Sequence, residues 1–212
     1  NKKVTKKNAK IPWPTKEVMN QIYDKSLWGR GEFKFYSGEG SYNIQIVNPF
    51  KEAVTVFLSS FKKPLTVCDL GCGDFNIGKN FVKYANKYVA IDIVEDLIAY
   101  NKEKFQVNNL EFHCLDIAID ELPNGDCAIV RQVLQHLSNN EVQSVLEKLS
   151  KFKYIILTEH IPVGNFIPNK DIISGQGIRL KEKSGLNILE APFNFKVKEE
   201  KHLTSVVLNN NK

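Results

Sequence analysis

The sequence lacks any apolar run long enough to span a lipid bilayer, and its first residues show no signal-peptide pattern. It also lacks a C-x-x-C pair, Cys and His at zinc-like intervals, internal repeats and low-complexity linkers. These absences argue against a membrane protein, a disulfide-rich secreted domain and a zinc module. We therefore predict a cytoplasmic location, no membrane partner and no metal site.

The cysteines that are present fall in or beside apolar stretches that are predicted to be buried strands. They are Cys68, Cys72, Cys114 and Cys127. A cysteine in a core behaves as a small apolar side chain, so we expect four buried free thiols rather than a metal site. This also fits a reducing compartment.

At 212 residues the chain can bury a full core without metal or disulfides, and we predict one domain over residues 1–212. The net charge of +5 is modest, but five lysines fall within residues 1–10. Without interleaved aromatics and arginines, this run predicts a flexible, solvated basic arm and makes nucleic acid an unlikely partner. We expect helices and a lid in residues 11–61 and a ligand-binding core in residues 62–212.

The prediction of fold and site rests mainly on the stretch of residues 65–81, LTVCDLGCGDFNIGKNF. Its apolar start suits a buried parallel strand, and Gly71 and Gly73 follow where the backbone must turn tightly. Apolar residues then recur at helical spacing from Asn76 to Val82. The unit predicts strand, glycine turn and helix, with backbone N–H groups directed at a ligand.

Two nucleotide-binding patterns are incomplete in this loop. A dinucleotide fingerprint would need glycine at position 76, where the chain has Asn76, and no G-K-[ST] phosphate loop is present. Asp69, at the end of the strand, would repel a pyrophosphate. A second apolar strand ends in Asp92, nineteen residues after Gly73, where an acid can accept hydrogen bonds from both ribose hydroxyls. A third predicted strand ends near Asp116.

The run D-L-G-C-G and the acids that follow it resemble class I S-adenosylmethionine (SAM) methyltransferases. The resemblance implies an α/β Rossmann-like fold: a mostly parallel seven-stranded sheet, helices on both faces and a C-terminal antiparallel hairpin, here matched to Phe195–Lys198 and Leu203–Leu208. It also implies that Asp116 and Ile117 bind the adenine. The predicted cofactor-binding residues are Asp69, Gly71, Cys72, Gly73, Asp92, Ile93, Asp116, Ile117, Arg131 and Gln132.

The same resemblance places a lid ahead of the glycine loop, because family members often close that segment over the cofactor. Trp28, Tyr36 and Glu39, in a glycine-rich stretch, are the lid and substrate-binding candidates, and a packed surface loop is the alternative for each. The run Val130–Leu137 resembles the fourth family motif, whose exit faces the transferred methyl group. His136 is there either a base for a substrate hydroxyl or a structural residue.

A fifth strand, Tyr154–Thr158, runs into the catalytic candidates Glu159 and His160. Strand alternation lets only one of the two face the site, unless the strand has ended before them. The irregular segment 161–185 follows and predicts a substrate loop. In it Arg179 either clamps an anionic substrate group or forms an exposed salt bridge.

The sequence has no Asn-Pro-Pro-[Tyr/Phe] run, so methylation of an amino group loses support. The runs Tyr36–Ser41, Arg131–Leu137 and Thr158–His160 are similar to those of small bacterial methyltransferases of surface-polysaccharide (capsule) biosynthesis. This resemblance implies O-methylation of a small polar molecule, at a sugar hydroxyl or a phosphoramidate-type oxygen on a nucleotide-linked or phosphorylated acceptor. Two alternatives stay open: a NAD-binding Rossmann oxidoreductase and a catalytically silent SAM-fold partner subunit.

Overall fold

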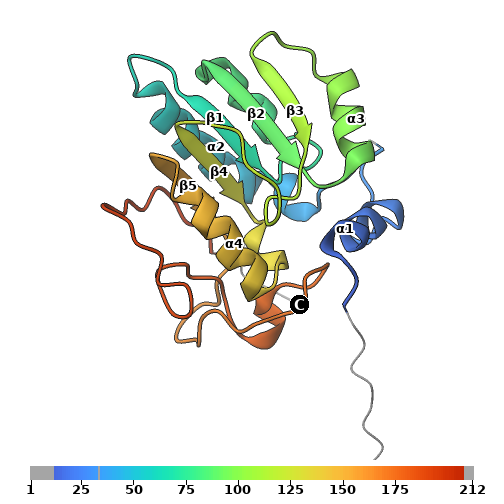
Figure 1. Cartoon of the computed structure of the whole chain (residues 1–212), viewed down its shortest axis with the longest axis vertical. Coiled ribbons are helices and arrows are strands. Elements are labelled where there is room, and N and C mark those ends of the chain that lie inside the picture. The colour runs from blue at the N-terminus through green and yellow to red at the C-terminus, as the bar shows by residue number, and fades with distance from the viewer. Residues whose placement is uncertain (1–11, 33, 208–212) are drawn as a thin grey trace, which may run out of the picture.

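The computed structural model describes residues 12–32 and 34–207, and the predicted basic arm of residues 1–10 lies outside them. The described part contains one five-stranded sheet, with all neighbouring strands parallel, in the order β3-β2-β1-β4-β5. Figure 1 shows the carboxyl ends of the strands at one edge, with α1 and the segment after β5 beyond it. The strands are β1 (Thr66–Leu70), β2 (Lys87–Asp92), β3 (Leu110–Cys114), β4 (Cys127–Arg131) and β5 (Tyr154–Thr158).

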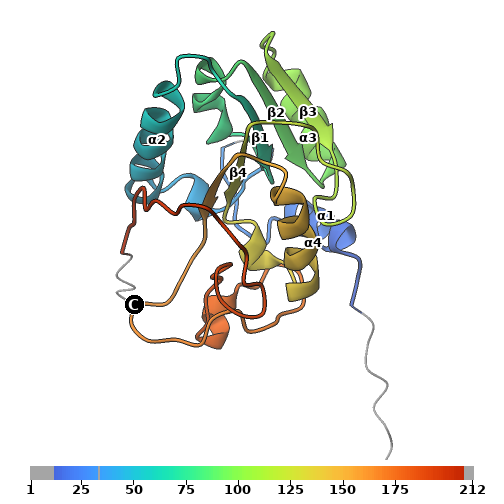
Figure 2. The ribbon, with the colours of Figure 1, turned by 60° about the vertical axis from the view of Figure 1, so that its left-hand side comes forward.

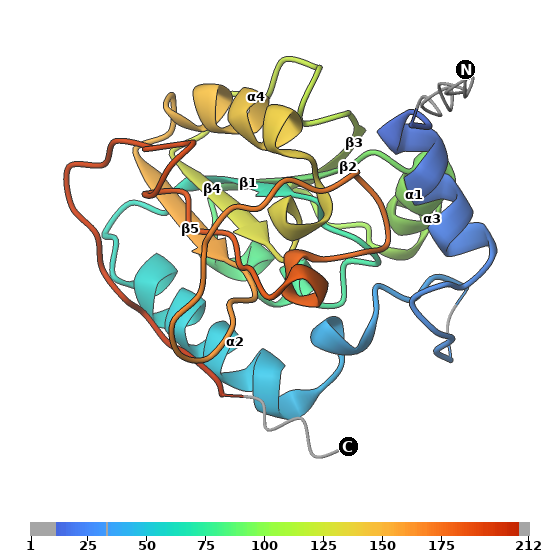
Figure 3. The same ribbon diagram turned by 90° about the horizontal axis from the view of Figure 1, so that it is seen from below.

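Helices cover both faces of the sheet, with α2 on one face and α4 on the other (Figures 2 and 3). The α-helices are α1 (Thr15–Asp24), α2 (Ile44–Ser59), α3 (Glu95–Lys104) and α4 (Asn139–Leu149). Short 3-10 helices are η1 (Glu39–Ser41), η2 (Gly78–Asn80), η3 (Val82–Tyr84), η4 (Leu134–His136) and η5 (Arg179–Glu182).

Two apolar cores follow from the alternation of side chains along the strands. In β4, Ala128 and Val130 belong to the core under α4, whereas Cys127 and Ile129 belong to the core under α2. Neighbouring strands alternate in the same way, so the central strands are apolar on both faces. The sheet is therefore a rigid layer between two cores, and its carboxyl edge is left for polar groups.

The fold is the Rossmann-like one that the sequence predicts, but the count of seven strands and the C-terminal hairpin are wrong. No strand occurs among the described residues after Thr158. In the segment predicted to form the hairpin, Phe195 packs against the core, but the other apolar side chains face solvent: Val197 is 46% exposed and Val207 is 68% exposed. Alternating residues form a strand when one face is buried, and here no buried face fixes a register.

The helix predicted after the glycine turn is also replaced, by η2 and η3. The side chain of Asn80 donates to the backbone oxygens of Asn76 (3.1 Å) and Ile77 (2.8 Å), which an α-helix would need as acceptors. Such local side-chain bonds compete with helix formation. Phe81 and Val82 keep their predicted burial all the same.

Candidate active site

A cavity of about 380 Å³ opens at the carboxyl ends of β1 and β4. In an open parallel sheet this is where strand order reverses and where ligands bind, because the crossovers leave the sheet on opposite sides. Ligand pockets begin at roughly this volume. All ten predicted cofactor-binding residues line the cavity, together with Trp28, His136 and His160.

The glycine loop forms one wall of the cavity, and its backbone leaves no room for a side chain at Gly71 or Gly73. Gly71 has φ +78° and Gly73 φ +55°, where other residues are strained. A Cβ at Gly71 would lie 2.4 Å from Val133 Cγ2, and one at Gly73 would lie 2.4 Å from Ser37 Oγ. The loop therefore presents bare backbone to whatever occupies the cavity.

Three carboxylates stand at the ends of β1, β2 and β3, as the sequence pattern predicts. Asp92 accepts the N–H of Gly73 (3.0 Å) and of Val94 (3.1 Å), so β2 and the glycine loop are held together at the cavity wall. Burial raises the pKa of Asp92. Asp116 accepts the N–H of Ala118 (2.9 Å), which fixes the turn that brings Ile117 to the cavity.

Asp69 is the most deeply placed of these acids and accepts the Tyr88 hydroxyl at 2.9 Å. Burial raises its pKa to about 7, while the hydrogen bond from Tyr88 and the charge of Arg131 act the other way. Arg131 leaves the end of β4 and donates to the backbone oxygen of Gly40 at 2.5 Å. Its Nε is buried and has no hydrogen-bond partner among the described residues.

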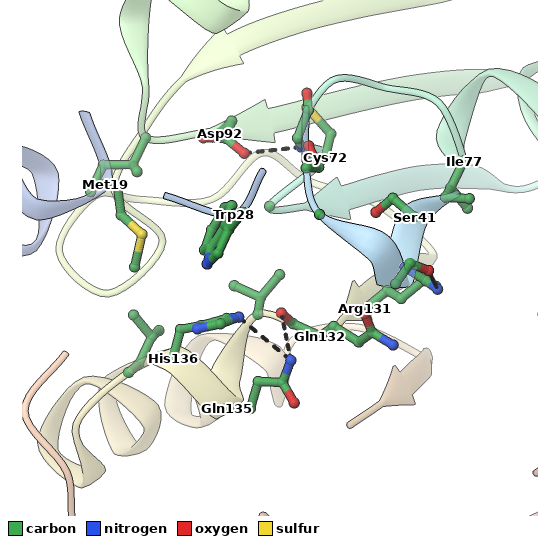
Figure 4. A pocket seen from close by; sticks show the side chains of 18 of the residues that line it. Met19, Trp28, Ser41, Cys72, Ile77, Asp92, Arg131, Gln132, Gln135 and His136 are labelled. Carbon is green, nitrogen blue, oxygen red and sulfur yellow. Dashed lines mark hydrogen bonds between the residues drawn. The ribbon is translucent and has the colours of Figure 1, made fainter. Parts of the chain in front are cut away.

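The lid candidates separate into one cavity residue and two surface residues. Trp28 lines the cavity and lies between Asp92 and His136 (Figure 4), with its ring centroid 5.1 Å from that of His136. The Tyr36 hydroxyl instead donates to Glu39 at 3.3 Å in an exposed contact, and neither residue lines the main cavity. The segment does cover the glycine loop, but with Ser37, Gly38, Gly40 and Ser41.

Sequence reasoning missed the contacts that hold this segment down. The Ser37 N–H donates to Asp74 Oδ2 at 2.9 Å, and the Ser37 hydroxyl accepts the N–H of Asp74 at 2.8 Å. Tyr42 donates to the same carboxylate at 2.8 Å, and Tyr23 pairs with the Ser37 hydroxyl at 3.0 Å. An acid directly after Gly73 was the available signal.

His136 lines the cavity with a defined tautomer. Its Nδ1 lies 3.1 Å from the Gly175 oxygen and 3.2 Å from the Gly177 oxygen, so Nδ1 carries the proton. Burial lowers the pKa of His136 to about 4, against the effect of these two carbonyls, and keeps the ring neutral at physiological pH. The Nε2 lone pair is thus an acceptor, and it receives a long hydrogen bond from the side-chain amide of Gln135 at 3.5 Å.

β5 ends at Thr158, before Glu159 and His160, and only one of these two residues lines the cavity. His160 lines the cavity, with Nε2 3.1 Å from the Gln132 amide and a buried Nδ1 that has no partner in the described residues. Burial lowers its pKa. Glu159 lies behind the wall and accepts the N–H groups of Leu134 (2.9 Å) and Gln135 (3.2 Å), so it does not reach a ligand.

The interpretation of Arg179 as a substrate clamp is wrong, because its side chain is 1% exposed and does not line the cavity. Four of its N–H bonds go to protein: to the backbone oxygens of Lys170, Leu134 and Leu137 and to the side chain of Asn139. It is not the exposed salt-bridging residue of the alternative either. The cation of segment 161–185 that lines the cavity is Lys181, which sequence reasoning did not select; Gln135, Gln176 and Ile178 line it as well.

The described residues hold no group of three His, Cys, Asp or Glu side chains placed to bind a metal ion. In the same part of the chain, no helix combines the length and apolar character needed to cross a bilayer.

Residues 67–152 match a protein family described as "Methyltransferase domain". No curated protein sequence gives a significant match. Among solved structures, magnesium protoporphyrin IX methyltransferase from Synechocystis PCC 6803 with bound SAM is similar at 17% identity and TM-score 0.54, over 79% of this chain and 83% of that one. The N-methyltransferase NodS from Bradyrhizobium japonicum WM9, with S-adenosylhomocysteine (SAH), has TM-score 0.50 and 12% identity over 64% and 68%.

At these identities the solved structures establish the fold alone. The matched domain and the cavity together give the class: the chain is a SAM-dependent methyltransferase, and its cofactor is SAM. The residues fit that group, because Gly71 and Gly73 offer bare backbone, Asp92 offers a carboxylate for hydroxyls, and the wall around them is largely apolar. The NAD-dependent alternative therefore loses its support.

Proposed function

We propose that the enzyme methylates an oxygen atom of a small polar acceptor that carries an anionic group. The observation that carries the proposal is His136, a neutral imidazole at the cavity whose Nδ1–H is held by two backbone oxygens and whose Nε2 remains an acceptor. Such a group can receive the proton of a hydroxyl as its oxygen attacks a methyl group.

We assign one part of the cavity to the cofactor and the other part to the acceptor. The glycine loop, Asp92 and the turn after Asp116 hold the cofactor, which supplies a methyl group on a positively charged sulfur. Gln132, Gln135, His136, His160 and Trp28 face the acceptor. Uncharged hydrogen-bonding groups beside an aromatic ring suit a hydroxyl-bearing molecule, and Lys181 at the cavity provides a cation for a phosphate or carboxylate.

In this arrangement the protein contributes alignment, exclusion of water and a proton acceptor. The sulfonium is already an activated leaving group, so holding the attacking oxygen in line with the methyl carbon accounts for most of the rate. Trp28, packed against His136 and Tyr23, closes the cavity on the side of the N-terminal segment.

As to the acceptor itself, a sugar hydroxyl or a phosphoramidate-type oxygen on a nucleotide-linked or phosphorylated precursor of a bacterial surface polysaccharide combines the required features. We also propose that the chain acts as one methyltransferase domain, with residues 161–185 as its substrate loop. The names of the similar structures, one acting on magnesium protoporphyrin and one an N-methyltransferase, do not favour either alternative acceptor, because the identities are low.

The test is transfer of a radiolabelled methyl group from SAM to matched sets of acceptors: phosphorylated sugars and nucleotide sugars, the same compounds without the charged group, amines, and RNA. We expect transfer to hydroxyl-bearing anionic compounds, with His136→Asn lowering kcat and Lys181→Ala raising KM. Transfer to amines alone, or to RNA alone, would refute the proposal.

A further inference from the structure

The turn that follows β4 carries His136 into the cavity, and two buried side chains, one acidic and one basic, hydrogen-bond to it from two sides. We call residues 132–137 the His136 turn. Gln132, its first residue, has φ +56°, a conformation that is uncommon for a residue other than glycine and that the surroundings must hold in place. The Gln132 N–H donates to the Thr158 oxygen at 2.7 Å, so β5 supports the start of the turn.

Glu159 holds the N–H groups of the turn. Its two carboxylate oxygens accept the backbone N–H of Leu134 at 2.9 Å and of Gln135 at 3.2 Å. These are free donors at the start of a 3-10 helix, and a carboxylate there replaces water as their acceptor. The side chain comes from the residue directly after β5, so it is anchored to the sheet.

Arg179 holds the carbonyl groups of the same turn. It donates to the Leu134 oxygen at 3.0 Å and to the Leu137 oxygen at 2.8 Å. The planar guanidinium fixes several acceptors at once, which a lysine ammonium cannot do with the same geometry. Burial raises the pKa of Glu159 to about 8, and the nearby charge of Arg179 opposes this effect. The carboxyl group can accept the two N–H groups in either protonation state, so the geometry does not depend on its charge.

Segment 161–185 also contacts the imidazole ring of His136 directly. The oxygens of Gly175 and Gly177 receive the Nδ1–H of His136, and the Gly175 N–H donates to the His136 backbone oxygen at 2.9 Å. Arg179 lies two residues after Gly177, so one segment supplies the guanidinium that grips the turn and the carbonyls that orient the ring.

We propose that Glu159 and Arg179 are positioning residues that hold the His136 turn from its N–H side and its carbonyl side, and so fix the ring of His136 with Nε2 toward the acceptor. This geometry is independent of the reaction, but its consequence for rate depends on the proposed role of His136. It assigns a task to two side chains that do not line the cavity.

The first readout needs no acceptor. Nitrogen-15 spectra of histidine-labelled protein report which ring nitrogen is protonated, and His136→Asn identifies the His136 signals by their loss. In Glu159→Gln and Arg179→Met we expect the His136 resonances to shift or broaden, while the SAH dissociation constant changes less than about threefold. Arg179→Lys should restore part of the native pattern.

Asn109→Ala is the matched control. Asn109 also links loops through backbone oxygens, those of Val82 (3.0 Å) and Ala85 (2.9 Å), but away from the cavity. We expect its His136 resonances to match the wild type. If Arg179→Met does not fold, as judged by loss of SAH binding, the spectra of Arg179→Lys and Glu159→Gln test the positioning role instead.

Unchanged His136 resonances in variants that bind SAH normally would overturn the proposal. The second readout is transfer to an acceptor, where we expect kcat in Glu159→Gln to fall on the order of 10- to 100-fold, because small displacements of a reacting group cost that much. If His136→Asn transfers methyl groups normally, the proposed base is wrong, and the spectra still decide the positioning role by themselves.

Discussion

Gly71 is a residue at which both the backbone angle and the available space require glycine. Gly71→Ala would place a Cβ 2.4 Å from Val133 at φ +78°, and overpacking of this kind costs about 1–3 kcal/mol. We expect SAH binding to weaken by on the order of tenfold or more, measured by calorimetry.

The control for Gly71 is Gly164, which has φ +84° and where an added Cβ would have nothing within 4 Å. Gly164→Ala carries the same kind of backbone strain without the collision, so it should leave SAH binding unchanged. Equal weakening in both variants would mean that backbone strain, and not the close approach to Val133, controls the loop.

Asp92 tests the cofactor assignment at a single carboxylate. Asp92→Ala removes the acceptor for the Gly73 N–H and the proposed acceptor for ribose hydroxyls. A hydrogen bond to a charged group contributes about 1.5–3 kcal/mol, so the SAH dissociation constant should rise roughly 10- to 100-fold. Asp96→Ala, an exposed acid on α3, is the control, and wild-type affinity in Asp92→Ala would contradict the assignment.

At the scale of elements, two hydrogen bonds between Ser37 and Asp74 hold the segment that contains Trp28 and Ser37 to the residue after the glycine loop. We call this pair of hydrogen bonds the latch. Ser37→Ala would leave the buried N–H of Asp74 without its acceptor and remove the partner of Tyr23. We expect faster release of SAH and greater quenching of Trp28 fluorescence by acrylamide, because the latch that closes the segment is weakened.

The experiment can be made specific because the sequence contains two tryptophans. In a Trp13→Phe background, fluorescence reports Trp28 alone. Ser60→Ala, which removes a hydroxyl that bonds the Phe57 oxygen near the end of α2, serves as the control. The same release rate in Ser37→Ala and Ser60→Ala would show that the latch does not govern the segment.

The elements that sequence reasoning predicted well are those with strong local signals. The apolar strands around Asp69 and Asp92 and the glycines between them fix the central sheet, because each local preference agrees with burial. The C-terminal hairpin was wrong because an alternating pattern says nothing about whether a partner strand will cover it. The helix after Gly73 was wrong because Asn80 captures helix carbonyls, a competition that periodicity does not reveal.

The acceptor half of the site was harder to predict for a different reason. Glu159 and Arg179 have the residue types of catalytic and anion-binding groups, yet both bond to backbone groups of the His136 turn. Which way a charged side chain points depends on contacts between β5, segment 161–185 and the turn, which are distant in sequence. Lys181, two residues from Arg179, lines the cavity instead.

At the scale of the whole molecule, buried acids make stability depend on pH in an unusual direction. Burial raises the pKa of Asp69 to about 7 and that of Glu159 to about 8, and it also raises that of Asp92. A group whose pKa is higher in the folded state stabilises the fold fully below its unfolded pKa, and this contribution is lost as pH rises through the folded value. His136, lowered to about 4, has the opposite effect: its contribution is present above pH 6.5 and is lost as pH falls toward 4.

Above about pH 6.5 the contribution of His136 to the free energy of unfolding no longer changes. The pH dependence in that range therefore reports the buried acids. We expect the free energy of unfolding to fall between pH 6.5 and 8 by on the order of 1–2 kcal/mol, since each group that loses a proton only in the unfolded state contributes up to about 1.4 kcal/mol per pH unit. Urea titrations at a series of pH values measure it. Asp69→Asn keeps an acceptor for the Tyr88 hydroxyl but cannot ionise. Its free energy of unfolding should therefore fall less steeply with pH below pH 7 than that of the wild type. The control Asp96→Asn, at an exposed site, should behave as the wild type does. A wild-type stability that does not change with pH over this range would mean that Asp69 and Glu159 are already ionised in the folded protein, held so by Arg131 and Arg179.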